Sequence, residues 1–337
     1  MKKIRVAING FGRIGRIVLR QLIQNERMEV VALNDFMDPK SAAHLFKYDS
    51  VHKTFKGEVS NDDGHIYVNG HPIIVLNEKK PALLPWKSMD IDVVIEATGK
   101  FVTKAKAKQH IDKAGAKKVI IAAPAKGQSN GVKYVVLGVN DHVIDKDDTI
   151  ISNSSCTTNN VAPLVKILDE NWGIQKGFIT TVHSYTTDQN IIDGYHKDLR
   201  RGRAAAYSIV PTTTGAAKAI TKIFPHLGRN LGGAGIRVPV PDGSLTDLTC
   251  TLKKPTSIEE INAKFKEAAE GELKGILEYT EDPIVSMDVI GNTHSAVFDS
   301  KLTAVLGDKN KLIKVVAWYD NEMGYSTRLV ELIEKFV

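Results

Sequence analysis

Short apolar runs alternate with amphipathic segments along the first half of the chain. The runs have the length of buried strands and lie at residues 4–9, 29–35, 92–98 and 118–122. The segments between them repeat apolar side chains at helical spacing, at residues 12–24 and 104–114. Because strands that alternate with helices build βαβ units, the pattern predicts an α/β fold with a doubly wound parallel sheet of Rossmann type. Residues 66–68 and 73–76 flank Asn69-Gly70, so a small antiparallel hairpin is expected as an insertion.

The second half of the chain carries longer strand patterns. The strand candidates lie at residues 177–185, 235–239, 244–254 and 312–319, and the helical patterns lie at residues 157–171, 212–224 and 257–269. Ser257 and Glu260 form a capping-box sequence at the start of the third helix. This half is predicted to be an α+β domain with a mainly antiparallel sheet. A final amphipathic segment follows at residues 322–337.

Composition narrows the class of protein. The chain of 337 residues is 42% hydrophobic and 25% charged, as expected for a globular protein of about two domains. The only cysteines, Cys156 and Cys250, give no disulfide framework and favour a reducing, cytoplasmic compartment. No apolar run approaches the ~18 residues of a membrane-spanning helix, so no membrane partner is expected.

A net charge of +6 and a pI near 9.0 are compatible with nucleic acid or with phosphorylated small molecules as partners. Acidic and basic residues are dispersed along the chain except in the basic cluster at 196–203. That cluster contains no interleaved aromatic residues for base stacking, so phosphate recognition is favoured and nucleic acid is not expected as the primary partner.

A glycine-rich turn follows the first predicted strand and opens the first predicted helix. It contains Gly10, Gly12 and Gly15 in the spacing of a dinucleotide-binding loop, where glycines allow a tight turn and close approach of the pyrophosphate. Asp35 ends the next strand, 20 residues beyond Gly15, where a carboxylate can accept hydrogen bonds from the adenosine ribose. The carboxylate would also repel a 2′-phosphate. Together these residues predict NAD as the cofactor, whereas the glycines alone could mark a turn without a ligand.

Cys156 lies in a polar stretch immediately before a helical pattern. A thiol at a helix amino terminus is expected to have a lowered pKa and to act as a nucleophile. Cys250 alternates with Leu248 and Leu252 in a strand pattern, as an inert buried cysteine would. His183 ends a strand and could supply the base that a thiol needs, although a structural role for this histidine stays open from the sequence alone.

Several motifs together resemble those of phosphorylating glyceraldehyde-3-phosphate dehydrogenases, over nearly the whole chain. They are INGFGRIGR at 8–16, SCTTN at 155–159, HSYT at 183–186, HKDLRRGRAA at 196–205, PTTTGAAKA at 211–219 and WYDNEMGYS at 318–326. The resemblance implies that Cys156 attacks the aldehyde of glyceraldehyde 3-phosphate and that His183 takes the thiol proton. It further implies that NAD oxidises the adduct to a thioester, which inorganic phosphate cleaves to 1,3-bisphosphoglycerate in glycolysis or gluconeogenesis.

The resemblance also implies binding roles for individual residues. The cofactor residues would be Gly10, Gly12, Arg13, Ile14, Gly15, Asp35, Thr98 and Asn321. The substrate phosphate would bind at Thr186 and Arg237, and inorganic phosphate at Ser155, Thr157, Thr214 and Gly215. No metal ligand is implied.

The family organisation implies an NAD-binding domain at residues 1–155, to which a C-terminal helix at 321–337 returns, and a catalytic domain at 156–320. It also implies a homotetramer in which the basic loop lines a neighbour's cofactor site.

Some positions depart from the usual family pattern. Asn160 replaces a second cysteine, Ala122 replaces a serine or threonine near the nicotinamide, and Thr187 replaces an asparagine. Gly194-Tyr195 replaces an apolar-proline pair, which makes strict exclusion of NADP less secure.

Erythrose-4-phosphate dehydrogenase activity, with water as acyl acceptor, is the alternative function. A nucleic-acid or surface-binding role, as a secondary function, is the alternative of another class.

Overall fold

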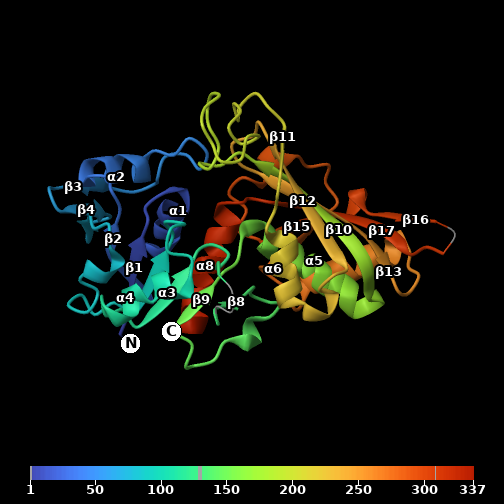
Figure 1. Cartoon of the computed structure of the whole chain (residues 1–337), viewed down its shortest axis with the longest axis horizontal. Helices are drawn as coiled ribbons and strands as arrows, with labels where there is room; N and C mark the ends of the chain where they lie inside the picture. The colour runs from blue at the N-terminus through green and yellow to red at the C-terminus, as the bar shows by residue number, and fades with distance from the viewer. Residues whose placement is uncertain (1, 128–130, 308) are drawn as a thin grey trace. The chain divides into compact units, whose positions relative to one another are not determined.

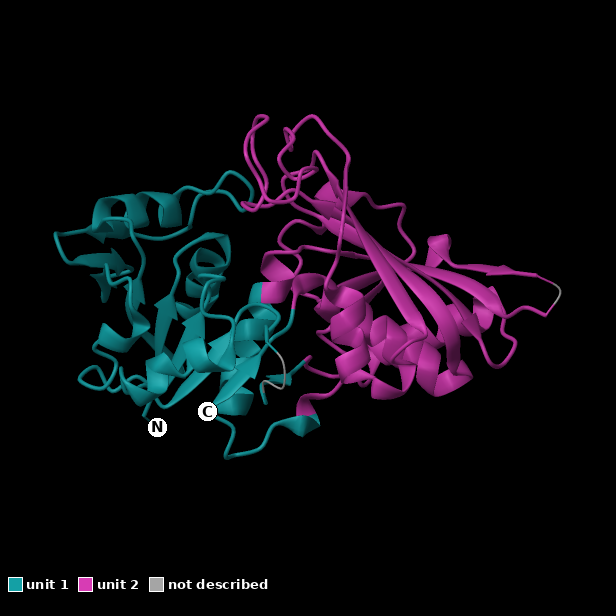
Figure 2. Ribbon diagram, in the orientation of Figure 1, with its two compact units in different colours: residues 1–135, 142–154, 326–337 teal, residues 136–141, 155–325 magenta. Residues whose placement is uncertain are grey.

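The computed structural model describes residues 2–127, 131–307 and 309–337 and divides into two compact units (Figure 2). Unit 1 comprises residues 1–135, 142–154 and 326–337, and unit 2 comprises residues 136–141 and 155–325. Residues 136–141, which were expected in the first domain, group with unit 2 because Gly138 lies against Leu273 and Ile276. The final helix begins in unit 2, and its residues from Ser326 onwards belong to unit 1.

The sheet of unit 1 has nine strands among the described residues, in the order β3-β4-β5-β2-β1-β6-β7-β9-β8 (Figure 1). The strands are β1 (Ile4–Asn9), β2 (Met28–Asn34), β3 (Val59–Asn61), β4 (His65–Val68), β5 (His71–Leu76), β6 (Val93–Glu96), β7 (Lys118–Ile121), β8 (Lys133–Tyr134) and β9 (Ile150–Ser152). The pairs β3-β4 and β4-β5 are antiparallel and the others are parallel. This confirms the predicted Rossmann-type sheet.

The strand order reverses between β1 and β6, because the chain builds outward through β2 on one side of β1 and then returns to the other side. Val6, Ala7 and Ile8 of the central β1 are fully buried, which explains its continuous apolar sequence. Asn69 and Gly70 have φ values of 51° and 78°, as a type I′ hairpin turn requires, so the predicted hairpin is also confirmed.

The helices of unit 1 differ from the predicted pattern in two places. They are α1 (Arg13–Leu22), α2 (Pro39–Lys47), α3 (Lys104–Ala107) and α4 (Gln109–Asp112), with the short 3₁₀ turn η1 (Pro81–Leu83). The single helix predicted at 104–114 is wrong, because the segment breaks at Lys108, where the amide of Ile111 bonds to the Lys108 carbonyl in a tighter turn. Helix α2 was not predicted, although Asp38 caps it and Pro39 occupies its first position.

Unit 2 contains a mainly antiparallel sheet in the order β11-β12-β10-β13-β17-β15-β14, with β16 paired to β17 (Figure 1). Its strands are β10 (Ile174–Ser184), β11 (Val210–Thr212), β12 (Leu231–Val238), β13 (Ser244–Leu252), β14 (Leu277–Thr280), β15 (Ala296–Asp299), β16 (Ala304–Leu306) and β17 (Leu312–Tyr319). Among the described strands of this second sheet, only β10-β12 and β14-β15 pair in parallel. The predicted α+β architecture is therefore confirmed.

Helices cover one face of this second sheet. They are α5 (Cys156–Trp172), α6 (Ala216–Ile223) and α7 (Ile258–Glu270). The 3₁₀ turns of unit 2 are η3 (Pro225–Leu227), η4 (Ser286–Val289) and η5 (Ser300–Leu302), and the turn η2 (Asp141–Val143) has residues in both units. Helix α5 packs on β10, β13, β15 and β17, and it contacts α6 and α7. Strand β13 alternates buried and partly exposed residues, as expected for a sheet with one covered face.

The predicted capping box of α7 is confirmed, because the Glu260 amide donates to Ser257 Oγ at 3.1 Å and the Ser257 amide donates to the Glu260 carboxylate at 3.1 Å. The final helix α8 (Met323–Phe336) buries the five apolar residues of its predicted stripe, Leu329, Val330, Leu332, Ile333 and Phe336. No helix in the described ranges is both long and apolar enough to span a membrane.

Phe265→Ala is expected to lower the free energy of unfolding of unit 2 by about 3–5 kcal/mol, because its fully buried ring leaves a cavity. This ring stacks on Phe298 with 4.0 Å between centroids, which joins α7 to β15. Urea denaturation measures the loss. Ile258→Ala on the same helix is the control, since Ile258 is 39% exposed and its truncation should lose less than about 1 kcal/mol. Equal losses in the two variants would contradict this packing.

Candidate active site

The glycine loop joins β1 to α1 with little space for side chains. Gly10 has a φ of 101°, and a Cβ added there would lie 2.7 Å from the backbone of Ala97. A Cβ at Gly15 would lie 2.1 Å from the carbonyl oxygen of Gly10, so only glycine allows the helix to start so close to the strand. Gly12 caps α1, is exposed, and has open space where a Cβ would be.

The first turn of α1 suits an anion. No side chain caps the helix, so its amides are oriented toward a ligand such as a pyrophosphate. Arg13 and Ile14 are its first two residues and are partly exposed. The guanidinium of Arg13 forms an ion pair of 2.6 Å with the buried Asp49. Burial opposes the charge of Asp49, but hydrogen bonds from His52, Arg13 and Val51 outweigh it and lower the Asp49 pKa to about 2.

Asp35 is held against the glycine loop. One carboxylate oxygen accepts a hydrogen bond of 2.7 Å from the Phe11 amide, and the other accepts one of 2.7 Å from the Phe36 amide. Each oxygen retains a lone pair, and the residue is partly exposed, so ribose hydroxyls could donate to it. Thr98, two residues beyond β6, donates its amide to Glu96 at 2.9 Å. The glycine contacts, the uncapped helix and the fixed carboxylate therefore fit a dinucleotide without a 2′-phosphate.

Cys156 is the first residue of α5. Ser155 caps the helix, since its Oγ accepts a hydrogen bond of 3.1 Å from the Thr158 amide. Ser154 has a φ of 59°, a left-handed conformation that costs a serine about 1 kcal/mol or more and turns the chain sharply before the cysteine. The amide of Cys156 has no hydrogen-bond partner in the structure as described, so it can donate to a substrate oxygen.

His183 approaches this thiol from the end of β10. Its Nε2 lies 3.4 Å from the Sγ of Cys156. The imidazole is buried, and its Nδ1 lies 2.8 Å from the carbonyl oxygen of Ser184. Tyr319 contacts the imidazole edge to face, at 5.9 Å between centroids. The structure therefore brings together the two residues that the sequence suggested as nucleophile and base.

Arg237 lies beside His183 because β10 and β12 pair in parallel with these two residues in register. Its Nη1 contacts Nδ1 of His183 and donates a hydrogen bond of 2.9 Å to the Ser184 carbonyl. A guanidinium has donors only, so Nδ1 accepts when it bonds to Arg237, whereas it donates when it bonds to the Ser184 carbonyl. The predicted phosphate ligand and the predicted base are thus in direct contact.

Burial opposes a charge on either member of the Cys156-His183 pair. It raises the pKa of the Cys156 thiol, despite the positive charge of Arg237 and hydrogen bonds from Thr157. Burial, followed by the charge of Arg237, lowers the pKa of His183 to about 3, and the Ser184 carbonyl offsets this only in part. The lowered thiol pKa expected from the helix position is therefore wrong for the thiol alone. Proton transfer from Sγ to Nε2 creates two charges that attract across 3.4 Å, so the charged forms are favoured together.

Asn321 follows β17 and is fixed by two serines that the sequence analysis missed. Its Oδ1 accepts hydrogen bonds from Ser184 Oγ at 2.9 Å and Ser244 Oγ at 2.6 Å. Ser244 Oγ also accepts from the Ser184 amide at 3.1 Å, so its own hydrogen points to Asn321. The Nδ2 group of Asn321 is left to donate to a ligand, as a nicotinamide carbonyl requires.

The residues predicted to bind phosphate differ in their exposure and in their hydrogen-bond partners. The hydroxyl of Thr157 points inward and lies 2.9 Å from that of Tyr319. Thr186 follows β10 and is partly exposed. Thr214 accepts a hydrogen bond of 3.2 Å from the Ala216 amide at the start of α6. Gly215 caps α6 and is exposed, with open space where a Cβ would be.

The departures from the family pattern also have clear positions. Asn160 is fully buried and donates to the Trp318 carbonyl at 3.3 Å, so it acts in the core. Ala122 follows β7 and bonds through its amide to the Glu96 carbonyl at 2.9 Å. Thr187 is exposed, and Tyr195 is 95% exposed.

Two arginines of the basic loop are paired locally. Arg201 contacts Asp188, and Arg203 forms an ion pair of 3.0 Å with Asp193. This pairing reduces the positive field that a nucleic-acid surface would need.

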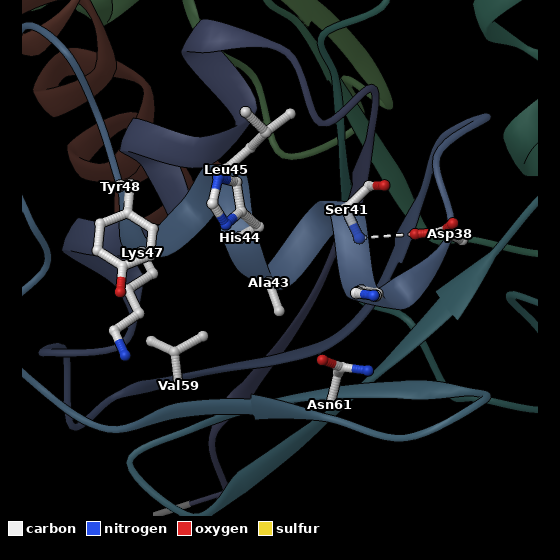
Figure 3. Close-up of a pocket in the computed structure, with 10 residues that line it drawn as sticks. Asp38, Ser41, Ala43, His44, Leu45, Lys47, Tyr48, Val59 and Asn61 are labelled. Carbon is white, nitrogen blue, oxygen red and sulfur yellow. Dashed lines mark hydrogen bonds between the residues drawn. The ribbon is translucent and has the colours of Figure 1, made fainter.

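A hollow of unit 1 lies between α2 and β3 (Figure 3). Its lining includes His44, Lys47 and Tyr48, and Asp38 accepts a hydrogen bond of 2.6 Å from the Ser41 amide at its rim. None of the predicted site residues lines this hollow. It is therefore separate from the cofactor loop.

Comparison with known sequences identifies relatives over nearly the full chain. Residues 4–104 match the family profile described as glyceraldehyde 3-phosphate dehydrogenase, NAD binding domain, and residues 155–321 match the C-terminal domain profile of the same family. A glyceraldehyde-3-phosphate dehydrogenase of Mycobacterium avium is 54% identical over 98% of this chain and 97% of its own. That of Thermotoga maritima is 54% identical over 98% of both chains, and glyceraldehyde-3-phosphate dehydrogenase 2 of Bacillus subtilis is 51% identical over 98% and 96%. The first profile confirms NAD as the cofactor.

With inorganic phosphate present to engage Arg237, His183→Gln is expected to slow the alkylation of Cys156 by iodoacetamide at neutral pH by about tenfold or more, because the thiolate must then form alone against burial. The pH at which the thiol reacts should also move upward, because the imidazole no longer takes the proton. Peptide mapping after timed alkylation measures both effects. Cys250 should stay unmodified, since burial raises its pKa to about 12.

His226→Gln is the matched control. His226 is an exposed histidine of unit 2 that pairs with Asp169 at 2.6 Å, so its loss should leave the profile unchanged. An unchanged alkylation profile in His183→Gln would show that the imidazole does not accept the thiol proton.

Proposed function

Because the chain belongs to the glyceraldehyde-3-phosphate dehydrogenase family, we propose that it oxidises D-glyceraldehyde 3-phosphate with NAD and inorganic phosphate to 1,3-bisphosphoglycerate. The observation that carries the proposal is the 3.4 Å approach of Cys156 Sγ to His183 Nε2. A thiol beside an imidazole at a helix amino terminus is suited to covalent aldehyde chemistry. The reaction would serve glycolysis or gluconeogenesis.

The first step forms a bond between Sγ of Cys156 and the aldehyde carbon. His183 takes the thiol proton at Nε2, and the carbonyl π electrons move to oxygen. The free amide of Cys156 and the protonated imidazole donate hydrogen bonds to that oxygen, which takes up the proton to complete a thiohemiacetal.

Arg237 would couple binding of the substrate phosphate to this step. While Arg237 donates to Nδ1 of His183, the proton of the neutral imidazole lies on Nε2, which then cannot accept from the thiol. A phosphate that draws Arg237 away allows Nδ1 to carry the proton and donate to the Ser184 carbonyl, 2.8 Å away. Nε2 then faces Sγ as a base. Thr186 would complete the substrate-phosphate site.

NAD, when bound, supplies the hydride acceptor that oxidises the thiohemiacetal to a thioester. His183 accepts the hydroxyl proton during this step. Inorganic phosphate, held by Ser155, Thr157, Thr214 and Gly215, then attacks the thioester carbon. The C–S bond breaks, the acyl phosphate leaves and Cys156 returns as thiolate. The 2.9 Å contact of Thr157 with Tyr319 means that Thr157 must turn outward to bind phosphate through its hydroxyl.

The cofactor roles follow the chemistry of the residues. The amides at Gly12, Arg13 and Ile14 would hold the pyrophosphate, with Gly10 and Gly15 keeping the loop compact. Asp35 would accept from the adenosine ribose. Thr98 and Asn321 would serve the nicotinamide half. Residues 1–155 with 321–337 would form the NAD-binding domain, and residues 156–320 the catalytic domain.

We assign the protein to the cytoplasm and to a homotetramer. Both cysteines are free thiols, as a reducing compartment allows. Large apolar side chains that are at least 70% exposed gather in the loop between β10 and β11. They are Ile191, Ile192, Tyr195, Leu199, Tyr207 and Ile209. Such a set of apolar groups supports burial against another subunit.

The purified protein is expected to reduce NAD with glyceraldehyde 3-phosphate at a rate that depends on inorganic phosphate, because the thioester needs phosphate as its acyl acceptor. Cys156→Ala should lose at least about 10³-fold in kcat, since no other group can form the thioester. Stopped-flow absorbance of NADH measures both effects. NADP should be a poor substitute, owing to Asp35.

Cys250→Ala is the control for the thiol and should keep full turnover. Turnover that persists in Cys156→Ala would overturn the mechanism. Turnover that is independent of phosphate and faster with erythrose 4-phosphate would favour the alternative dehydrogenase activity.

Light scattering is expected to give a mass about four times the 37.0 kDa of one chain. Replacing Ile192 and Leu199 together by serine should shift the protein toward smaller species, because it removes apolar area from the exposed loop. Val285→Ser, at a 57% exposed position outside this loop, is the control. A monomeric protein at micromolar concentration would contradict the assembly.

A further inference from the structure

A buried polar network lies at the carboxyl ends of the central strands of unit 1, and the proposed function assigns no role to the residue at its centre. Glu96, the last residue of β6, is at its centre and is fully buried. Its other members are Asn9, Asn34, Glu78, Trp86, Thr98 and His110. Groups that can only donate hydrogen bonds fix the direction of the bonds from both ends of the network.

The first end is the backbone amide of Glu78. It donates to Oδ1 of Asn34 at 2.8 Å, which makes the other side-chain atom of Asn34 its amino group. That amino group donates to Oδ1 of Asn9 at 2.7 Å. The amino group of Asn9 therefore points to Glu96 and donates to Oε2 at 2.5 Å.

The second end is the indole of Trp86, which has no acceptor. It donates to Nδ1 of His110 at 3.0 Å, so Nδ1 carries no proton. The imidazole is then neutral and has its proton on Nε2, which donates to Oε2 of Glu96 at 3.1 Å. The contact between His110 and Glu96 is a hydrogen bond rather than an ion pair.

Thr98 supplies two more donors to the same carboxylate. Its amide donates to Oε1 at 2.9 Å, and its hydroxyl also contacts Oε1. The hydroxyl accepts from the Lys100 amide at 3.1 Å, so its own hydrogen points to Glu96. Four donors face two oxygens, which is the full complement of an ionised carboxylate and leaves no place for a proton. Within the described ranges, Glu96 has no cationic partner.

This anion lies where the strand order reverses. Glu96 is in register with Asn9 at the ends of the neighbouring strands β6 and β1, and a dinucleotide crosses the sheet at such a point. Asp35, after β2, marks the side of the adenosine ribose. The nicotinamide half therefore lies on the side of β6, toward Glu96.

We infer that Glu96 is a buried anion that makes the protein bind the oxidised cofactor, whose nicotinamide ring is positively charged, more tightly than the reduced cofactor, whose ring is neutral. It thereby favours entry of NAD and release of NADH. The inference rests on the proposed use of NAD and adds a residue that discriminates between the two redox states. A unit charge roughly 10 Å from another, at an effective dielectric constant of about 20, changes affinity by about tenfold.

Titration calorimetry of the wild type and Glu96→Gln with NAD, NADH and ADP-ribose tests the inference without turnover. The ratio of the NADH dissociation constant to the NAD dissociation constant should fall by about three- to tenfold in Glu96→Gln, because the anion is removed. ADP-ribose, which lacks the ring, should bind both proteins within about twofold of each other. Asp35→Asn is the control and should weaken NAD and NADH equally.

Trp86→Phe provides a second variant that keeps Glu96. Without the indole donor, Nδ1 of His110 is open to a proton, and an imidazolium beside Glu96 would offset the negative charge. The same ratio should therefore fall in this variant. An unchanged ratio in both variants would overturn the inference, and so would an equal loss of affinity for all three ligands, which marks a structural role only. A wild-type protein that binds neither NAD nor ADP-ribose would instead refute the proposed function.

Discussion

The approach of the Cys156 thiol to the His183 imidazole is the constraint on which the chemistry of unit 2 depends. Two local structures create it. Helix α5 begins at the cysteine, after the left-handed turn at Ser154 and the cap by Ser155. Strand β10 ends just beyond the histidine. Because β12 and β13 pair with it on both sides, the backbone at His183 is held in place and so is the base of the imidazole. Because burial disfavours each charge alone, the thiol must lose its proton as the imidazole gains it.

Groups that can only donate hydrogen bonds set the protonation state at both sites. In unit 2 the guanidinium of Arg237 contacts Nδ1 of His183 and so decides which imidazole nitrogen carries the proton. In unit 1 the indole of Trp86 does the same to His110 and leaves Glu96 as an anion. The difference is that Arg237 can be drawn away by a phosphate, whereas Trp86 is fully buried and permanent. The Arg237-His183 contact therefore responds to substrate, whereas the Trp86-His110 contact keeps a permanent negative charge on Glu96.

Much of the fold follows from local sequence patterns, because a strand or helix that buries one face must repeat apolar residues at its own period. The patterns gave the central strands of both sheets, the hairpin at Asn69 and the capping box at Ser257. Short edge elements such as β14 and β16 carry too few residues for a period and were missed. For the site, the sequence motifs indicated the individual residues but not which of them lie in contact. The register that sets Arg237 beside His183 links residues far apart in the chain, and no spacing encodes it.

The central claim is that Cys156 becomes acylated during turnover. Its most direct test is intact-protein mass spectrometry after the enzyme is mixed with NAD and glyceraldehyde 3-phosphate in the absence of inorganic phosphate, followed by peptide mapping. We expect an acyl adduct on the peptide that contains Cys156, and its loss as acyl phosphate within one turnover of adding phosphate. An adduct on another residue, or NADH formation without any adduct, would contradict the account.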